Sequence, residues 1–195
     1  GKGRTGTIDT LVEHFRPHNT PVFSMRRLQR DGEAVSSTRI RALLENGRIE
    51  EANNLLGRNY AVTGVTVKGR QLGRTIGFPT LNLPWSPELI PRFGVYAVRA
   101  KRETDAAWHK GVANYGLRPT VTGGDAEPLL EVHLFEPTDW PYGTGVTVEW
   151  LHFIRPEKTF ADLDALKAQI RSDRTTAAAS LEGKQCLGHD LNLPS

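Results

Sequence analysis

A glycine-rich loop runs directly into an alternating segment at Gly69-Arg70-Gln71-Leu72-Gly73-Arg74-Thr75-Ile76-Gly77-Phe78-Pro79-Thr80-Leu81-Asn82-Leu83. Pro79 fixes its own φ angle and moves Phe78 from helical towards extended backbone, so a strand should follow the loop. Side chains alternate along a strand, which places Thr80 and Asn82 on one face and the two leucines on the other. The segment therefore predicts a flexible basic loop that opens onto two neutral oxygen ligands.

This arrangement suits a phosphate chain and a hard cation. Backbone N–H groups at Gly69, Gly73 and Gly77 can approach phosphate oxygens closely, with Arg74 beside them. Thr80 and Asn82 offer oxygen ligands of the kind that Mg²⁺ takes in nucleotide sites. The loop is not a Walker P-loop, because it lacks the lysine and leads into a strand instead of a helix. An ordinary hairpin turn that feeds a half-buried strand remains the alternative.

The composition bounds the class of protein. The chain has 195 residues, enough for one domain or for one domain with part of another. Its net charge of +3 suits an anionic small substrate and does not by itself indicate nucleic acid. No apolar run is long enough to cross a membrane, and the single cysteine, Cys186, fits a reducing cytoplasm. Because the chain begins at Gly1 and its only methionine is Met25, we expect a fragment of a longer protein.

From Tyr60 onwards the pattern has a period of two residues. The expected strands are 61–67, 80–83, 94–100, 109–116, 129–135 and 146–154. Several short strands with turn signals between them favour a mainly β, antiparallel barrel. Asp162 is a suitable N-cap for a final helix that carries Leu163, Leu166 and Ile170 on one face. From about Ala177 few residues look like core residues, so we expect a mobile end.

The first part of the chain has a different pattern. Helical spacing predicts a helix from Ile8 to Phe15, followed by a short buried strand at 21–25. A second helix should begin after Val35 and a third should run from Ile49 to Leu56, ending at Gly57. The helix start holds hydroxyls and basic side chains, namely Ser36, Ser37, Thr38, Arg39 and Arg41. Such a start can bind an anion, although a plain helix cap explains the same residues.

A carboxylate lies in the alternating segment at 130–135. Glu131 and His133 should share one face of this strand with Phe135. A carboxylate there could take a proton from a substrate alcohol, and general-base action of this kind contributes about 10²–10⁴-fold. The alternatives are the exposed face of an edge strand for Glu131 and a structural role for His133.

These segments resemble the riboflavin kinases. Gly73 to Asn82 is similar to the family's G-R-x-x-G-F-P-T-x-N signature, and Glu131-Val132-His133-Leu134 to its E-x-H-L segment. Two further stretches, 111–120 and 155–160, resemble the G-V-A-N-x-G-x-R-P-T and R-x-E-x-x-F segments.

The resemblance implies a Greek-key barrel and a Mg²⁺-dependent reaction of riboflavin with ATP that gives FMN and ADP. It further implies that Glu131 is the base that activates the ribityl 5′-hydroxyl. By the same resemblance, Arg155 is a flavin-site contact. A surface ion pair between Arg155 and Glu157 is the alternative.

The residues before the barrel resemble the end of a nucleotidyltransferase domain, as in the bifunctional bacterial riboflavin kinase/FMN adenylyltransferases. Ser36 to Arg41 is similar to an S-S-T-x-I-R motif that contacts ATP phosphates in that superfamily, and Gly1-Lys2-Gly3-Arg4 to an earlier loop. The superfamily's H-x-G-H motif is not found in the 195 residues. We therefore expect residues 1–58 to be a nucleotidyltransferase remnant, residues 59–195 to be a riboflavin kinase domain, and this chain to form no FAD.

Other functions stay open. A noncatalytic OB-like barrel that binds nucleic acid would need aromatic residues interleaved with a basic groove, whereas the four tryptophans are dispersed in the sequence. A remnant that props or blocks the kinase site is a third possibility. As partners we expect small-molecule substrates, without nucleic acid or membrane, and self-association is possible.

Overall fold

The computed structural model of the chain describes residues 3, 6–30, 32–118 and 126–182. Cys186 and most of the Gly1–Arg4 loop lie outside the described residues, as do Pro119 and Thr120 of the G-V-A-N-x-G-x-R-P-T segment. The chain divides between Val35 and Ser36 into two compact units.

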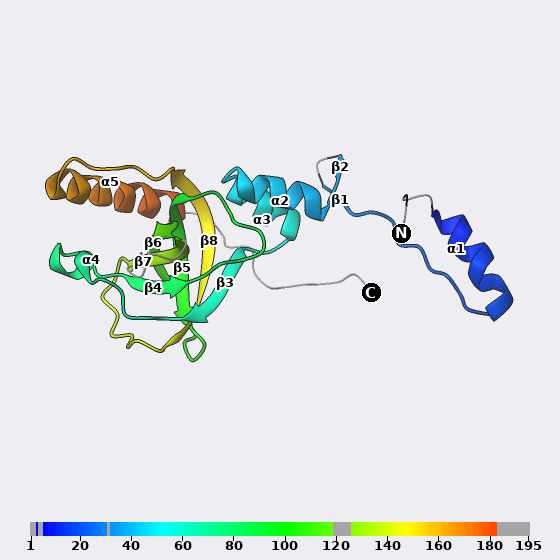
Figure 1. The fold of residues 1–195 in the computed structure, drawn as a ribbon, viewed down its shortest axis with the longest axis horizontal. Helices are drawn as coiled ribbons and strands as arrows, with labels where there is room; N and C mark the ends of the chain where they lie inside the picture. The colour runs from blue at the N-terminus through cyan, green and yellow to red at the C-terminus, as the bar shows by residue number, and fades with distance from the viewer. Residues whose placement is uncertain (1–2, 4–5, 31, 119–125, 183–195) are drawn as a thin grey trace. The chain divides into compact units, whose positions relative to one another are not determined.

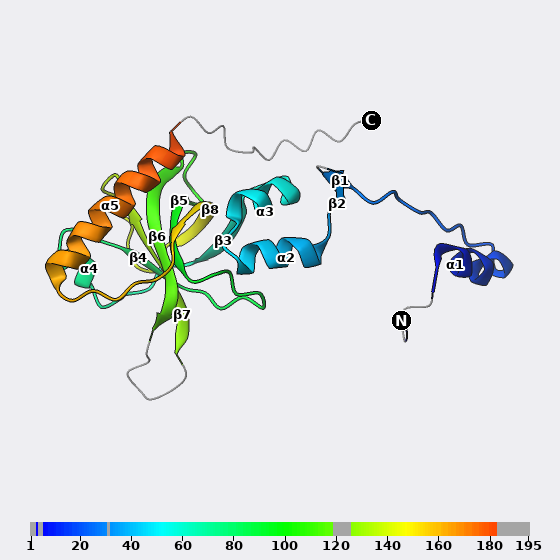
Figure 2. The same cartoon turned by 90° about the horizontal axis from the view of Figure 1, so that it is seen from above.

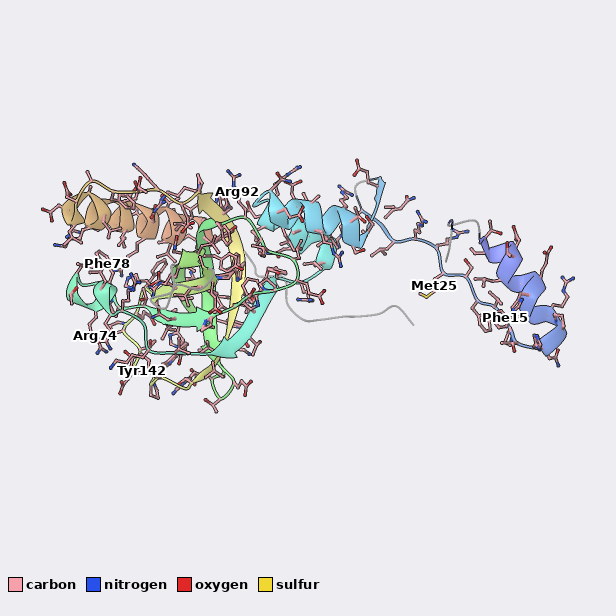
Figure 3. The ribbon with its side chains drawn as sticks, in the orientation of Figure 1. Phe15, Met25, Arg74, Phe78, Arg92 and Tyr142 are labelled. Carbon is pink, nitrogen blue, oxygen red and sulfur yellow. The ribbon has the colours of Figure 1, made fainter. Side chains whose placement is uncertain are left out.

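The first unit holds short elements: α1 (Ile8–Phe15), η2 (Arg16–His18), β1 (Gln29–Arg30) and β2 (Glu33–Ala34). The predicted helix at 8–15 is confirmed, and Thr7 caps it by accepting a hydrogen bond from Thr10 N at 3.2 Å. The predicted buried strand at 21–25 is wrong, because this segment is not extended in a sheet and Met25, labelled in Figure 3, is 92% exposed. A strand needs a neighbouring strand for its backbone groups, and no described residue pairs with this segment in a ladder.

The second unit is built on one curled antiparallel sheet of six strands in the order β3-β8-β5-β6-β7-β4 (Figure 1). The strands are β3 (Tyr60–Val65), β4 (Leu81–Pro84), β5 (Gly94–Arg102), β6 (His109–Arg118), β7 (Glu127–Leu134) and β8 (Gly145–Arg155). Strands β5, β6 and β7 follow one another as neighbours, and β8 returns to lie beside β5, which is the Greek-key arrangement. A single bridge between Val67 and Asn82 draws the two edges together, so the sheet is a half-barrel. The predicted mainly β fold is confirmed.

Aromatic rings fill the inside of the half-barrel. Trp150 is fully buried, and its ring lies 4.5 Å from Tyr96, 5.4 Å from Tyr115 and 5.5 Å from Trp85, measured between centroids. Tilted and edge-on aromatic contacts of this kind stabilise a core beyond the area they bury. Trp150 is therefore a core residue, and the half-buried Trp85 packs against it.

The last helix, α5 (Leu163–Leu181), covers the outer face of the sheet over β5, β6 and β8 (Figure 1). It begins as predicted at Asp162, whose carboxylate accepts a hydrogen bond from Ala165 N at 2.7 Å. The helix continues to Leu181, and the buried cluster beneath it comprises Val95, Ala97, Val112, Ala177 and Leu181. The expectation of few core residues from Ala177 onwards is therefore wrong up to residue 181, because small alanines let the helix approach the sheet closely.

Two helices precede the sheet, α2 (Ser37–Glu45) and α3 (Ile49–Leu56), and α3 packs on β3 and β8 (Figure 2). Asn53 joins α3 to the sheet from a buried position. Its side chain donates to Trp150 O at 2.8 Å and accepts from Tyr60 N at 2.7 Å. Beside it, Asn59 donates to Glu149 Oε2 at 2.8 Å. One asparagine thus satisfies backbone groups of two strands.

Replacement of Asn53 by alanine should lower the free energy of unfolding by about 1–3 kcal/mol, because two buried backbone groups lose their partner. Urea unfolding measured by circular dichroism tests this. Glu45→Ala, on the exposed surface of α2, is the control and should change the value by less than about 0.5 kcal/mol. Equal effects of the two substitutions would contradict the role given to Asn53.

Candidate functional site

One row of residues crosses the outer face of the sheet. Asn82 of β4 lies opposite Glu131 of β7, which lies opposite Asn114 of β6. Asn114 lies opposite Val95 of β5, and Val95 lies opposite Arg155 of β8. Directly opposed residues present their side chains on the same face, and Val95 belongs to the cluster under α5. Five strands thus bring together residues that are far apart in the sequence, on the face that α5 partly covers.

A cavity of about 360 Å³ lies over this row. Its walls come from the row, from the loop that holds α4 (Leu72–Thr75), and from α5. The polar lining comprises Arg70, Gln71, Thr80, Asn114, Arg118, Glu131, His133, Arg155, Glu157, Lys158 and Asp173, and the apolar lining includes Leu72, Ile76, Phe78, Val95, Val112, Phe160, Leu166 and Ile170. The size and the mixed lining suit a small organic molecule that carries charged groups.

Glu131 is a half-buried carboxylate in the wall of this cavity. Its Oε1 atom forms an ion pair with Arg118 at the end of β6. Burial raises the pKa of Glu131, while the positive charges of Arg118 and Arg70 act in the opposite direction and Glu157 adds to the rise. A carboxylate with a raised pKa is a stronger base, which favours a role in proton transfer.

Arg155 lies in the cavity wall in a two-pronged ion pair with Asp173 of α5. Its Nε donates to Asp173 Oδ1 at 2.9 Å and its Nη2 donates to Oδ2 at 2.7 Å. The alternative of an ion pair between Arg155 and Glu157 is therefore wrong, because the partner of Arg155 is Asp173. Glu157 instead accepts a hydrogen bond from Asn114 Nδ2 at 3.4 Å. The sheet and α5 are joined at the edge of the cavity by a rigid, geometrically specific contact.

Each glycine of the loop is required for a different structural reason. A Cβ at Gly69 would lie 2.5 Å from Asn82 Oδ1, so this glycine lets the loop backbone rest on the asparagine side chain. A Cβ at Gly73 would collide with the carbonyl oxygen of Phe78, and Gly77 has a φ of +89° that side chains disfavour. The loop is further held by Gln71, whose Nε2 donates to the hydroxyl of Tyr142 at 2.6 Å.

Asn82 carries an unpartnered oxygen. The residue is 4% exposed, and its Oδ1 atom has no hydrogen-bond partner among the described residues, while its Nδ2 donates to Thr80 O at 3.3 Å. A buried polar atom without a partner is costly unless a ligand supplies one. An unpartnered amide oxygen beside a glycine-rich loop fits a hard cation such as Mg²⁺. The described residues hold no cluster of three or more His, Cys, Asp or Glu side chains, so the remaining ligands would be phosphate and water oxygens.

The structure brings together only part of the predicted site. The predicted residues that line the cavity are Gly73, Thr80, Glu131 and Arg155. Asn82 and Gly69 lie against each other and are not among the lining residues. Arg74 and Gly77 are exposed and are not among the lining residues; Figure 3 labels Arg74 together with Phe78 and Tyr142.

The predicted anion site at the start of α2 is separate from this cavity. Of Ser36, Ser37, Thr38, Arg39 and Arg41, none lines it. Ser36 caps α2 by accepting a hydrogen bond from Arg39 N at 3.2 Å, as the plain helix-cap alternative requires. Binding of phosphates by these residues stays a prediction.

Several lining residues escaped the sequence analysis as site residues, among them Arg70, Arg118 and Asp173. Arg118 was quoted only inside a longer segment, and Asp173 lies in a helix whose polar face gives no such signal. Both are recognised through ion pairs with residues 13 and 18 positions away along the chain. Spacing alone carries no information on such pairs.

Comparison with known proteins identifies a matching family model and similar curated proteins. The family model described as "Flavokinase: Riboflavin kinase" matches residues 56–181. The bifunctional riboflavin kinase/FMN adenylyltransferase of Haemophilus influenzae is 45% identical over 179 residues, which are 92% of this chain and 57% of that protein. The protein of the same name from Escherichia coli is 40% identical over 177 residues, 91% of this chain and 56% of that protein. The chain thus spans a little over half the length of the curated relatives it matches.

A solved structure shares the fold. The crystal structure described as a macrolide-efflux protein from Streptococcus pneumoniae aligns with a TM-score of 0.75 at 31% identity. The alignment covers 89% of this chain and 55% of that one. Within the described part of the present chain, none of the helices has the length and apolar character that a bilayer crossing requires.

Proposed function

Because the chain belongs to the riboflavin kinase family, we propose that it transfers the γ-phosphoryl group of ATP to the ribityl 5′-hydroxyl of riboflavin, giving FMN and ADP. The observation that carries this proposal is the juxtaposition of Glu131 with Asn82 on adjacent strands. One is a half-buried base with a raised pKa, and the other offers an unpartnered oxygen beside a glycine-rich loop. Phosphoryl transfer needs such a pairing, because the acceptor hydroxyl and the phosphates must meet.

The proposed reaction has a simple balance. The 5′-hydroxyl gives its proton to the Glu131 carboxylate as its oxygen forms a bond to the γ-phosphorus. The bond between that phosphorus and the bridging oxygen breaks, and ADP leaves with the electron pair. Arg118 contacts Glu131 in the ligand-free protein, so its guanidinium also lies near the point where the transferring group must pass. Its positive charge can then stabilise that group.

Thr80 and Asn82 are the residues that we propose to hold the magnesium ion. A bound Mg²⁺ would neutralise charge on the β- and γ-phosphates. The loop backbone at Gly69 and Gly73 would lie over the phosphates, and Arg74 at the exposed side of the loop would contribute charge from outside the cavity. Arg155, held by Asp173, is proposed to contact the flavin through the donors that the ion pair leaves available.

The assignment of residues 1–58 to a nucleotidyltransferase remnant is part of the same proposal. The names of the curated relatives, which combine both activities, support it. Since the sequence contains no H-x-G-H motif, we propose that this chain makes FMN and no FAD. Its cytoplasmic location and any self-association likewise stay predictions.

One experiment tests both parts. The chain is incubated with riboflavin, ATP and Mg²⁺, and the flavins are separated chromatographically. We expect FMN to accumulate in proportion to enzyme and time, to depend on Mg²⁺, and to be unaccompanied by FAD. A lack of FMN would contradict the proposed kinase activity. Formation of FAD would contradict the proposal that residues 1–58 carry no adenylyltransferase activity.

The nucleic-acid alternative has less support. Two of the tryptophans, Trp85 and Trp150, pack together in the barrel interior. The ring of Trp108 is covered by Arg99 at 4.4 Å and by Lys101 at 4.8 Å, and the ring of Trp140 has Arg102 at 5.7 Å. Parallel titrations with riboflavin and with an oligonucleotide separate the two functions.

Replacement of Arg118 by glutamine should move the acid limb of kcat/KM to higher pH. Glu131 must be ionised to accept a proton, so activity falls as the pH drops through its pKa. Burial raises this pKa and Arg118 lowers it, so loss of the arginine should raise it further. The pH profile of FMN formation measures the shift, with Arg171→Gln on the exposed side of α5 as the control. A shift to lower pH, or none, would contradict the contact.

A further inference from the structure

His133 is a buried histidine for which the proposed reaction has no use. It lies two residues after Glu131 on β7 and on the same face, and it is 8% exposed. Its Nδ1 atom lies 2.9 Å from the carbonyl oxygen of Pro79, and its Nε2 atom is buried without a partner among the described residues. Burial lowers the pKa of His133 and the charge of Arg174 acts in the same direction, while the hydrogen bond to Pro79 acts in the opposite one; the net lowering favours the neutral ring, which carries one proton.

The contact with Pro79 fixes the position of that proton. A carbonyl oxygen only accepts hydrogen bonds, so Nδ1 must be the protonated nitrogen and Nε2 the bare one. The opposite tautomer would place two lone pairs against each other and leave a buried N–H without a partner. The side chain of His133 therefore donates a hydrogen bond from Nδ1 to the Pro79 carbonyl oxygen.

Pro79 lies where the backbone ladder between β4 and β7 stops. The last paired residues on this side are Leu81 and Val132. Pro79 lies beyond this last pair and has no N–H to donate to a neighbouring strand. Its carbonyl oxygen accepts a hydrogen bond from the His133 side chain instead of from a strand backbone. The His133 ring also meets the Phe78 ring edge to face, with 5.4 Å between centroids.

The same point holds the glycine-rich loop. Phe78 N donates to Gly73 O at 2.7 Å, which closes the loop on itself around α4. A continuous set of contacts thus runs from β7 through His133 to Phe78–Pro79 and on to Gly73. It joins the strand that carries the base to the loop and to the two oxygen ligands that follow it.

We propose that His133 is a positioning residue that holds the exit of the nucleotide loop, and with it Thr80 and Asn82, at a fixed place opposite Glu131. This inference rests on the proposed kinase function. His133 lines the cavity, and its proposed role is exerted through the Pro79 carbonyl and not through contact with the reacting atoms. Because the base and this donor are two residues apart on one strand, the strand itself sets the separation between proton acceptor and phosphate site.

Two amide substitutions test which nitrogen matters. The side-chain nitrogen of asparagine occupies the place of Nδ1 and that of glutamine the place of Nε2. His133→Asn should therefore keep kcat/KM for ATP within about 3-fold of the unmodified chain. His133→Gln should lower it by about 10- to 100-fold, since displacement of a reacting group by about 1 Å can cost about 10²-fold. The KM for riboflavin should change less than the KM for ATP in both variants.

Two measurements do not depend on catalysis. In the unmodified chain, ¹⁵N NMR of the imidazole should find the Nδ1–H tautomer, and finding the Nε2–H tautomer overturns the proposal even if neither variant folds. Amide hydrogen exchange without ligands should become faster at residues 72–82 in His133→Gln and stay unchanged in His133→Asn. Equal exchange and equal kinetics in the two variants would also overturn it, whereas a chain that makes no FMN but shows the expected tautomer and exchange would overturn only the proposed function.

Discussion

Replacement of Glu131 by glutamine is expected to lower kcat for FMN formation by about 10²–10⁴-fold, the range for loss of a general base. Glutamine has the size of glutamate and retains a carbonyl oxygen for Arg118, but it cannot take the hydroxyl proton. The KM values for ATP and riboflavin should change by less than about 3-fold, because the base acts in the transition state and not in substrate binding. Steady-state assays with separated flavins measure these effects.

The control for this substitution is Glu136→Gln. Glu136 lies two residues after the end of β7 and is exposed, so its loss tests for any general effect of removing a negative charge near this strand. Its turnover should match that of the unmodified chain. If Glu131→Gln kept near-normal turnover while the control behaved as expected, proton transfer to Glu131 would have to be abandoned as part of the mechanism.

Replacement of Asn82 by alanine should nearly abolish FMN formation, with kcat/KM for ATP lower by about 10²-fold or more. The substitution removes the buried Oδ1 atom that we propose to face the cation, and it leaves empty the space against which Gly69 rests. Riboflavin binding, which the proposal assigns to the other end of the row near Arg155, should be retained. Calorimetric titrations with Mg²⁺-ADP and with riboflavin measure the two affinities separately.

A second substitution at position 82 distinguishes the loss of an oxygen ligand for the cation from the loss of side-chain packing. Asn82→Asp keeps the volume and an oxygen in the same place, so it should retain more cation affinity than the alanine variant. Thermal unfolding of both variants should show an intact barrel. Equal loss of Mg²⁺-ADP binding in both, or near-normal turnover of Asn82→Ala, would contradict cation binding by this side chain.

Alternation along the chain predicted the strands and the side on which each residue lies, because a strand has a fixed period of two residues. Glu131 and His133 do share a face, and Ser36 and Asp162 do cap their helices. Alternation does not tell which face is inside the barrel. The row that carries Glu131 lies on the outer face under α5, which only the strand order and the helix position reveal.

Contacts between distant residues account for most of what the sequence did not predict. The partner of Arg155 is Asp173 in place of Glu157, because the end of β8 meets the middle of α5 in space. Leu163 was expected on the apolar face of this helix and is 51% exposed. The segment at 21–25 has strand-like composition, but composition supplies no partner strand.

The row across the outer face has a consequence for how freely the chain can change in length. Glu131 alternates with Val132, which is fully buried on the inner side of the same strand. Insertion or deletion of one residue within β7 would exchange the two sides and turn the carboxylate into the aromatic interior. The proposed base and the core packing thus occupy two sides of one strand, so a change in chain length is expected to be tolerated only in the connections at the strand ends.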